Sequence, residues 1–138
     1  MKGVAVIVCA VLLLAACGGG GGGSTAQDEI KAAYTGFFST KTSLATHVAL
    51  MEDGEKFKPV IQSFLSDPLA SGVSATVSSV TLQSADKATV VYTVKVAGIS
   101  LADQTGYAVR QDGKWKVADS TLCALVSLAG TPPAACKS

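Results

Sequence analysis

The chain has 138 residues, which is enough for one domain of ordinary size. It carries 11 Lys and Arg against 10 Asp and Glu, a formal net charge of +1, and a single His. This balance leaves too few unpaired basic residues for nucleic-acid binding. The lone His and the scattered acids argue against a metal site, so we expect neither a metal nor a cofactor.

The first residues are typical of an export signal. Lys2 precedes an uncharged apolar run, Gly3–Ala16, whose 14 residues would form a helix only about 21 Å long. That is shorter than the ~30 Å hydrocarbon core of a bilayer, so residues 1–16 are predicted to be a signal peptide. Its removal takes away Lys2 and leaves a neutral mature chain with ten basic and ten acidic residues.

The apolar run ends in Leu14-Ala15-Ala16-Cys17, which resembles the bacterial lipobox. The resemblance implies cleavage before Cys17 and a thioether bond from its thiol to diacylglycerol, which carries fatty acids such as palmitate. The protein would then be anchored to the outer face of the cell membrane. Two alternatives stay open: an ordinary secretory signal that leaves Cys17 free, and an uncleaved membrane anchor.

A glycine-rich spacer follows the predicted anchor. Six glycines, Gly18 to Gly23, precede Ser24 and Thr25. Such chain is flexible, and eight residues of it span roughly 16 Å. We therefore expect residues 17–25 to link the lipid to a single folded domain, residues 26–138. A spacer of this kind fits an upstream end that is tethered, which supports the lipobox interpretation.

The remaining cysteines form an even pair. Cys9 lies in the signal peptide and Cys17 in the lipobox, which leaves Cys123 and Cys136 in an oxidising, extracytoplasmic setting. A disulfide between them is predicted; it would close a loop of 12 intervening residues. Such a bond stabilises a fold by about 3 kcal/mol in the chain-entropy model. Two free thiols are the alternative.

Three helices are predicted in the first half of the domain, because apolar residues recur there at helical spacing. Thr25 is the expected cap of the first helix. Pro59 is expected in the first turn of the third, where its missing N–H does no harm. The predicted helices are Ala26–Lys41, Ser43–Met51 and Glu55–Ser66.

From Val73 onward the apolar period changes to two, which predicts antiparallel strands with one buried face. The alternation changes parity at Ser78-Ser79, as a β-bulge would cause. The inward face of the following strand is marked by Val90, Tyr92, Val94 and Val96.

A hairpin and a closing helix are predicted near the C-terminus. Asp112-Gly113 predicts a type I′ turn, which places Trp115 inward on the return strand. A last helix, Thr121–Ala129, would be capped by Asp119 or Ser120.

Helices followed by an antiparallel meander define an α+β fold. We expect N-terminal helices packed on a curved four-stranded antiparallel sheet, with a short C-terminal helix. A curved sheet wrapped on a helix gives a cone-like body with an open mouth. That is the shape of the nuclear-transport-factor-two-like and cystatin-like folds.

Four stretches carry a family resemblance: Val77–Val80, Ala88–Tyr92, Gly106–Val117 and Ser120–Leu125. They are similar to a family of actinobacterial exported proteins that includes the low-molecular-weight secreted antigen of mycobacteria. The resemblance covers roughly residues 31–130 and implies the fold rather than any catalytic residue. The lipobox and the glycine spacer are departures from the plainly secreted member.

Few residues are candidates for catalysis. His47 is the only His, and no Gly-x-Ser-x-Gly motif accompanies it. We therefore predict a protein that is not an enzyme. Because cone-like folds also host enzymes that move a proton, a small proton-transfer enzyme is kept as the second alternative. The side chains available to it are Asp103, Asp119, Tyr34, Tyr92 and Tyr107.

A membrane-tethered binding or accessory module of the cell envelope is the predicted function, and a protein-docking domain without a small ligand is the first alternative. The partners would be the membrane, through the lipid, and either an apolar ligand or an envelope protein. The polar stretch 52–58 is predicted to be solvated, with partner docking as its alternative. Six aromatic residues are candidates for an apolar ligand cleft or for the core: Tyr34, Phe37, Phe38, Tyr92, Tyr107 and Trp115.

Overall fold

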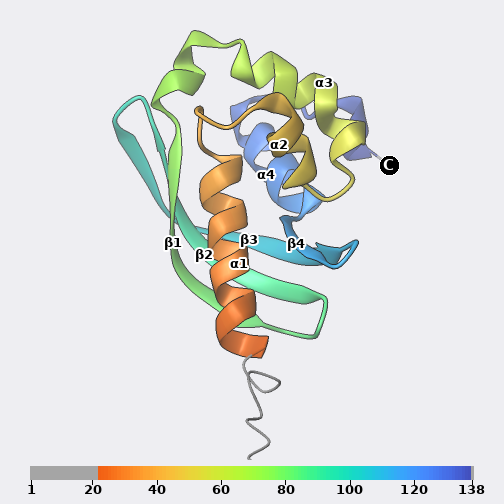
Figure 1. Cartoon of the computed structure of the whole chain (residues 1–138). Helices are drawn as coiled ribbons and strands as arrows, with labels where there is room; N and C mark the ends of the chain where they lie inside the picture. The colour runs from red at the N-terminus through yellow and green to blue at the C-terminus, as the bar shows by residue number, and fades with distance from the viewer. Residues whose placement is uncertain (1–21, 138) are drawn as a thin grey trace, which may run out of the picture.

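The computed structural model of the protein describes residues 22–137. They form four α-helices and one four-stranded antiparallel sheet, an α+β fold as predicted (Figure 1). The predicted signal peptide, Cys17 and the linker as far as residue 21 lie outside the described residues. Within the described part, no helix has both the length and the apolar character needed to span a bilayer.

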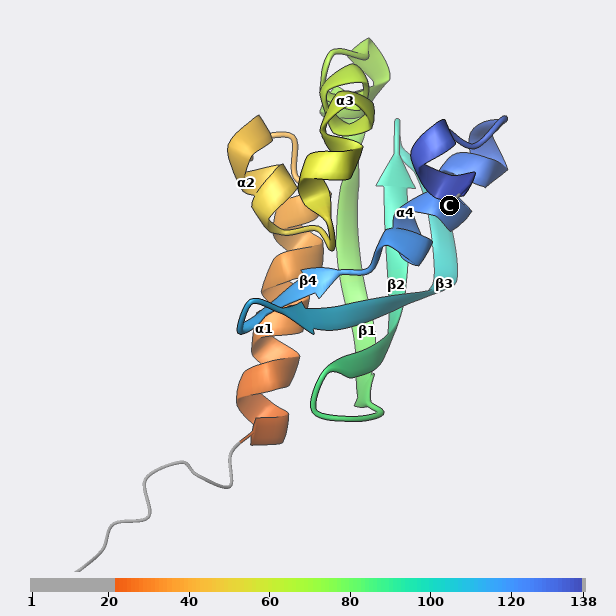
Figure 2. The ribbon, with the colours of Figure 1, turned by 90° about the vertical axis from the view of Figure 1, so that its right-hand side faces the viewer.

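The helices and strands follow one another in a simple order. Three helices come first, then four strands that pair in sequence order, then a closing helix. Figure 2 shows α1 beside the curved sheet, with α2, α3 and α4 gathered toward the end of the molecule opposite the start of α1. The elements are α1 (Gly22–Phe37), α2 (Leu44–Ala49), α3 (Gly54–Leu65), the 3₁₀ helix Pro68–Gly72, β1 (Ser74–Leu82), β2 (Lys87–Val96), β3 (Ile99–Gln111), β4 (Lys114–Val117), α4 (Asp119–Ala129) and the 3₁₀ helix Ala134–Lys137.

The core lies between α1 and the inner face of the sheet. Ile30 and Tyr34 of α1 are fully buried, and β2 buries alternate residues, as the period of two predicts. Each large apolar side chain buried in this way contributes about 1.5–3 kcal/mol to folding. The buried residues of β2 are Ala88, Val90, Tyr92 and Val94, and Val96 is half-buried.

The first helix starts and ends four residues earlier than predicted. Because α1 begins at Gly22, Thr25 lies inside it rather than capping it, and the last part of the predicted linker is helical. The helix ends at Phe37 in a tightened turn, in which Ser39 donates its N–H to the carbonyl of Gly36. The Ser39 hydroxyl then accepts the N–H of Lys41, a local bond that competes with further helix.

Pro59 does not lie in a first turn, and that prediction was wrong. The start of α3 is fixed at Gly54, where a Cβ would come within 1.9 Å of the Val48 carbonyl oxygen. Pro59 is therefore inside the helix and removes the bond that its N–H would make to Glu55. It lies on the exposed side, where a lost backbone bond costs least.

The cap of α4 also differs from the prediction. Both Asp119 and Ser120 lie inside the helix, and the residue before it is Ala118, whose side chain cannot accept a hydrogen bond. Instead the Glu52 carboxylate accepts the N–H of Asp119 at 3.1 Å. The backbone of Glu52 is held there by its own N–H, which donates to the carbonyl of Val117. The cap is thus supplied by a distant segment rather than by the helix itself.

The turns and bulges predicted from local sequence are present. The register of β1 on β2 shifts between Val77 and Ser79, as predicted. Asp112 and Gly113 have φ of 55° and 75°, the left-handed values that a type I′ turn requires. A second bulge, which the sequence did not reveal, lies in β3 at Asp103, with φ of 55°.

A disulfide joins Cys123 of α4 to Cys136 of the C-terminal 3₁₀ helix. The two Cα atoms are 5.6 Å apart. The cysteine arithmetic of the sequence predicted this pair, and the bond ties the last segment of the chain to the closing helix.

Candidate functional site

Five of the six candidate aromatic residues fill the core rather than lining a cleft. Tyr34, Phe37, Phe38, Tyr92 and Trp115 are all buried. The rings of Tyr34 and Tyr92 lie 5.0 Å apart, and those of Phe38 and Tyr92 are stacked at 5.7 Å. These are the separations of packed aromatic pairs, so the rings stabilise the fold through mutual contact.

Tyr107 lies apart from this cluster and is 45% exposed. Its neighbours Gly106 and Ala108 point inward instead, directly opposite Val90 and Ala88 of β2. A Cβ at Gly106 would come within 2.6 Å of the Tyr34 hydroxyl and 2.8 Å of the Tyr92 ring. The inward residues of β3, Gly106 and Ala108, therefore have small side chains, because rings from α1 and β2 occupy the space in front of them.

The hydroxyl of Tyr34 joins three elements. It donates to the carbonyl of Tyr107 at 2.7 Å, and it lies 3.3 Å from the hydroxyl of Thr121, which itself accepts the N–H of Tyr107. Burial raises the pKa of Tyr34 far above its usual value and that of Tyr92 to about 12, so both phenols stay protonated. In this position Tyr34 serves as a hydrogen-bond donor that links α1, β3 and α4.

The other candidates for proton-transfer chemistry lie in separate places. His47 is buried on α2, where its Nδ1 lies 2.9 Å from the carbonyl of Ser43 and its ring meets the edge of Phe37. Asp103 lies on the exposed bulge of β3, and Asp119 lies at the start of α4. The sequence candidates thus divide between the packed core, the bulge and the helix start.

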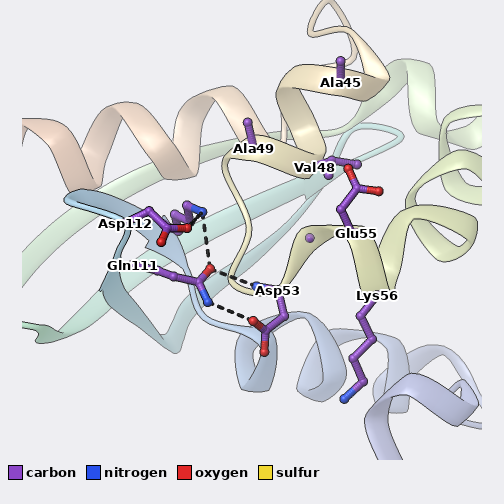
Figure 3. Close-up of a pocket in the computed structure, with 10 residues that line it drawn as sticks. Ala45, Val48, Ala49, Asp53, Glu55, Lys56, Gln111 and Asp112 are labelled. Carbon is purple, nitrogen blue, oxygen red and sulfur yellow. Dashed lines mark hydrogen bonds and ion pairs between the residues drawn. The ribbon is translucent and has the colours of Figure 1, made fainter.

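One cavity is a groove between α2, the start of α3 and the β3–β4 hairpin (Figure 3). It has a volume of about 600 Å³. Ala45, Val48 and Ala49 form an apolar wall, and the other lining residues are mostly polar. The polar and hairpin residues are Asp53, Gly54, Glu55, Lys56, Gln111, Asp112 and Lys116.

A pair of hydrogen bonds clasps the two sides of this groove. The Gln111 side chain donates from Nε2 to Asp53 Oδ1 at 2.8 Å, and its Oε1 accepts the N–H of Asp53 at 3.2 Å. Lys116 Nζ donates to the same Oε1 at 3.3 Å and lies 3.7 Å from Asp112. Asp53 is held in the left-handed region, at φ of 50°, so this clasp fixes a strained turn at the edge of the groove.

The rim of the groove is charged and exposed. Figure 3 shows Glu55 facing the Val48 side of the groove, across from the Asp53–Gln111 pair, while Lys56 points away. Glu55, Asp53 and Asp112 are exposed, whereas Lys116 is largely covered. This arrangement suits the polar surface of a macromolecule better than an apolar small molecule.

Sequence reasoning identified one side of the groove and missed the other. The stretch 52–58 was interpreted as a solvated loop with docking as its alternative, and three of its residues with side chains, Asp53, Glu55 and Lys56, line the groove. Gln111 and Lys116 were missed, because no local pattern indicates that the hairpin folds against a loop 58 residues away.

A second cavity, of about 340 Å³, is lined in part by Glu52. Tyr107, Lys87 and Ser120 are among the residues that line it. Burial raises the pKa of the Glu52 carboxyl, and the nearby carboxylates of Asp119 and Asp53 raise it further. Since Glu52 already accepts the N–H of Asp119, its position here is explained by capping α4. Residues 22–137 contain no group of three or more His, Cys, Asp or Glu side chains that could hold a metal.

The comparison with protein families gives a match over most of the chain. Residues 24–133 match the family described as low molecular weight antigen MTB12, C-terminal domain. That range includes the aromatic core, the groove and the clasp. A search of curated proteins finds no match.

Proposed function

The chain belongs to the family of the low molecular weight antigen MTB12, C-terminal domain, and on that premise we propose that it is a membrane-tethered accessory protein of the cell envelope. Its lipidated Cys17 holds it to the outer face of the membrane, and its folded domain docks onto a protein partner through the groove. The domain acts by binding and not by catalysis.

The observation that carries the docking proposal is the division of side chains between core and groove. An apolar ligand needs a cavity lined by hydrophobic rings. Five of the six candidate rings are buried in the core, and the groove offers charged rim residues around a small alanine and valine wall. A partner surface with basic and small apolar side chains complements that rim.

The tether proposal rests on Leu14-Ala15-Ala16-Cys17 and the glycines that follow. Substitution Cys17→Ser should block lipid transfer, so the precursor should stay uncleaved. Incorporation of radiolabelled palmitate and partition into a detergent phase measure this directly. Equal labelling of the wild type and the variant would refute lipidation at Cys17.

The groove can be tested in living cells with a photo-crosslinking residue. At position 55, on the groove rim, we expect a discrete crosslinked product that weakens when Asp53→Ala and Gln111→Ala are combined. The matched control places the same residue at exposed Ser84, in the turn between β1 and β2. Equal products from both positions would show that the groove has no special role.

A further inference from the structure

The first part of β3 exposes apolar side chains on the inner face of the sheet. Leu101 lies directly opposite Val94, and Ile99 opposite Val96, so all four share the face that elsewhere forms the core. Val94 is buried, yet Ile99 is 68% exposed and Leu101 42%. The apolar inner surface therefore extends beyond the helices that cover the rest of it.

The same segment also has an unpaired edge. β4 pairs with β3 only from Ala108 onward, so no strand of the described chain lies beside Ile99–Ala102 on that side. The two-residue turn at 97–98 makes Val96 and Ile99 a hydrogen-bonded pair. Because antiparallel pairs alternate, the N–H and C=O of Ser100 point away from β2, toward the open edge.

Other positions along this edge are already occupied. The carbonyl of Ala102 accepts the side-chain amide of Gln104 at 3.2 Å. The N–H of Tyr107 donates to the hydroxyl of Thr121 at 2.8 Å. Exposed main-chain groups at a sheet edge are normally covered in such ways, because they are templates for added strands. Ser100, between two exposed apolar residues, is where the edge is left open.

We propose that Ile99–Ala102 binds a short extended segment of another protein, which adds a strand to the edge of β3. The main chain of that segment bonds to Ser100, and its apolar side chains, at alternate positions, pack on Ile99 and Leu101. Main-chain bonds supply affinity and the alternate side chains supply specificity in binding of this kind.

The position of the tether argues for another protein rather than lipid or a second copy, and to this extent the inference rests on the proposed function. Only four residues separate Cys17 from Gly22, so the start of α1 stays within about 17 Å of the lipid. Figure 1 shows the β2–β3 turn at the opposite end of the molecule from that start. Two copies paired antiparallel through Ser100 would direct their tethers in opposite directions.

The test is an NMR titration of the mature chain carrying Cys17→Ser, so that its result does not depend on lipidation. The probe is the peptide Lys-Thr-Val-Thr-Val-Thr-Val-Lys. We expect the amides of Ser100, Leu101 and Ala102 to shift and the Ser100 amide to exchange more slowly. Ser100→Pro removes the donor and should weaken binding about tenfold or more. Ile99→Ser with Leu101→Ser should do the same if the proline variant is unfolded.

Tyr107→Ser is the matched control, since it also removes an exposed apolar side chain and should leave binding unchanged. N-methylation of every second peptide amide should abolish binding when the methylated amides are those that face β3. Methylation of the other set of amides, which face away, should leave binding intact. The inference is overturned if the peptide shifts groove residues instead, or if no variant weakens binding. It is also overturned if the unliganded protein dimerises through these residues or if they bind phosphatidylglycerol vesicles in preference to the peptide.

Discussion

The two parts of β3 belong to one strand and have opposite surroundings. From Gly106 to Val109 the strand has β2 on one edge and the start of α4 or β4 on the other. Its inward Gly106 packs against Tyr34 of α1 and Tyr92 of β2. From Ile99 to Asp103 every residue is exposed. Both parts pair with β2, so strand pairing alone does not bury a strand. What buries the second part is the cover supplied by α1 and α4.

The bulge at Asp103 marks the border between the two parts. It shifts the register on β2 between Tyr92 and Val94, and so it changes which residues of β3 point inward. Stability should therefore depend strongly on residues on one side of Asp103 and weakly on residues on the other.

The largest effect is expected from the disulfide, which secures the end of α4. Replacing Cys123 and Cys136 together by Ser should lower the free energy of unfolding by about 3 kcal/mol, because the unfolded chain loses a closed loop. The fold should survive, since the sheet and α1 lie outside that loop. Urea denaturation measures the loss. Reduced wild type should match the double variant, and a difference between them would mean that the serines act in another way.

Gly106→Ala tests the covered part of β3. The new Cβ would lie 2.6 Å from the Tyr34 hydroxyl and 2.8 Å from the Tyr92 ring, so the core must shift to admit it. We expect a loss of about 2 kcal/mol, typical of overpacking. Ala102→Val enlarges a residue in the open part and should change stability by less than about 0.5 kcal/mol. Equal losses in thermal melts would contradict the difference between the two parts.

Tyr34→Phe removes the hydroxyl that joins α1 to β3 and α4. The expected loss is about 1 kcal/mol, because the carbonyl of Tyr107 keeps a second donor in the N–H of Ala118. A double-mutant cycle with Thr121→Val measures the coupling between the two hydroxyls. The loss of stability in the double variant should be less than the sum of the two single losses. Tyr107→Phe, with its exposed ring, is the control and should have almost no effect.

Local signals predicted much of the fold, and the limits of the prediction lie where distant segments meet. The period of two and the Asp112-Gly113 turn correctly predicted strands and a hairpin, because both depend on neighbouring residues. Tyr107 was a candidate for the apolar cleft or the core, and it belongs to neither for a tertiary reason. An aromatic residue in a strand suggests an inward face, yet here the rings of α1 and β2 already fill the space that an inward Tyr107 would need.

The groove was beyond prediction for the same reason. Its clasp joins Asp53, in an exposed turn, to Gln111, the half-buried last residue of β3, and neither polar residue alone indicates a contact with a distant segment. The cap of α4 is similar, because a carboxylate from the α2–α3 loop supplies what Ala118 cannot. Sequence patterns identify caps within a few residues of a helix and miss those that tertiary contact brings in.

Glu52→Gln should change how stability depends on pH, with a smaller effect than the substitutions above. Burial raises the pKa of Glu52, so the folded chain binds a proton more readily than the unfolded chain. The stability that the protonated Glu52 carboxyl contributes is complete below the ordinary Glu pKa of about 4.3. It is lost as pH rises through the raised pKa of Glu52. Glutamine can still accept the N–H of Asp119 without titrating. Relative to wild type, the variant should gain stability as pH rises from about 4 through the raised pKa of Glu52; a constant difference would contradict the role of burial.

The smallest effect is expected in the open part of β3. Ile99→Ser and Leu101→Ser should each change the free energy of unfolding by less than about 0.5 kcal/mol, because these side chains are already exposed in the folded state. Val94→Ala is the matched control. It lies directly opposite Leu101 on the same face but is buried, so it should cost about 2 kcal/mol in lost transfer energy and cavity formation. If Ile99 and Leu101 add so little to folding, a role in binding accounts for their exposure, as the strand-addition proposal requires. If either serine substitution cost as much as Val94→Ala in urea denaturation, these side chains would be part of the core, and the open edge of β3 would not be available to a partner.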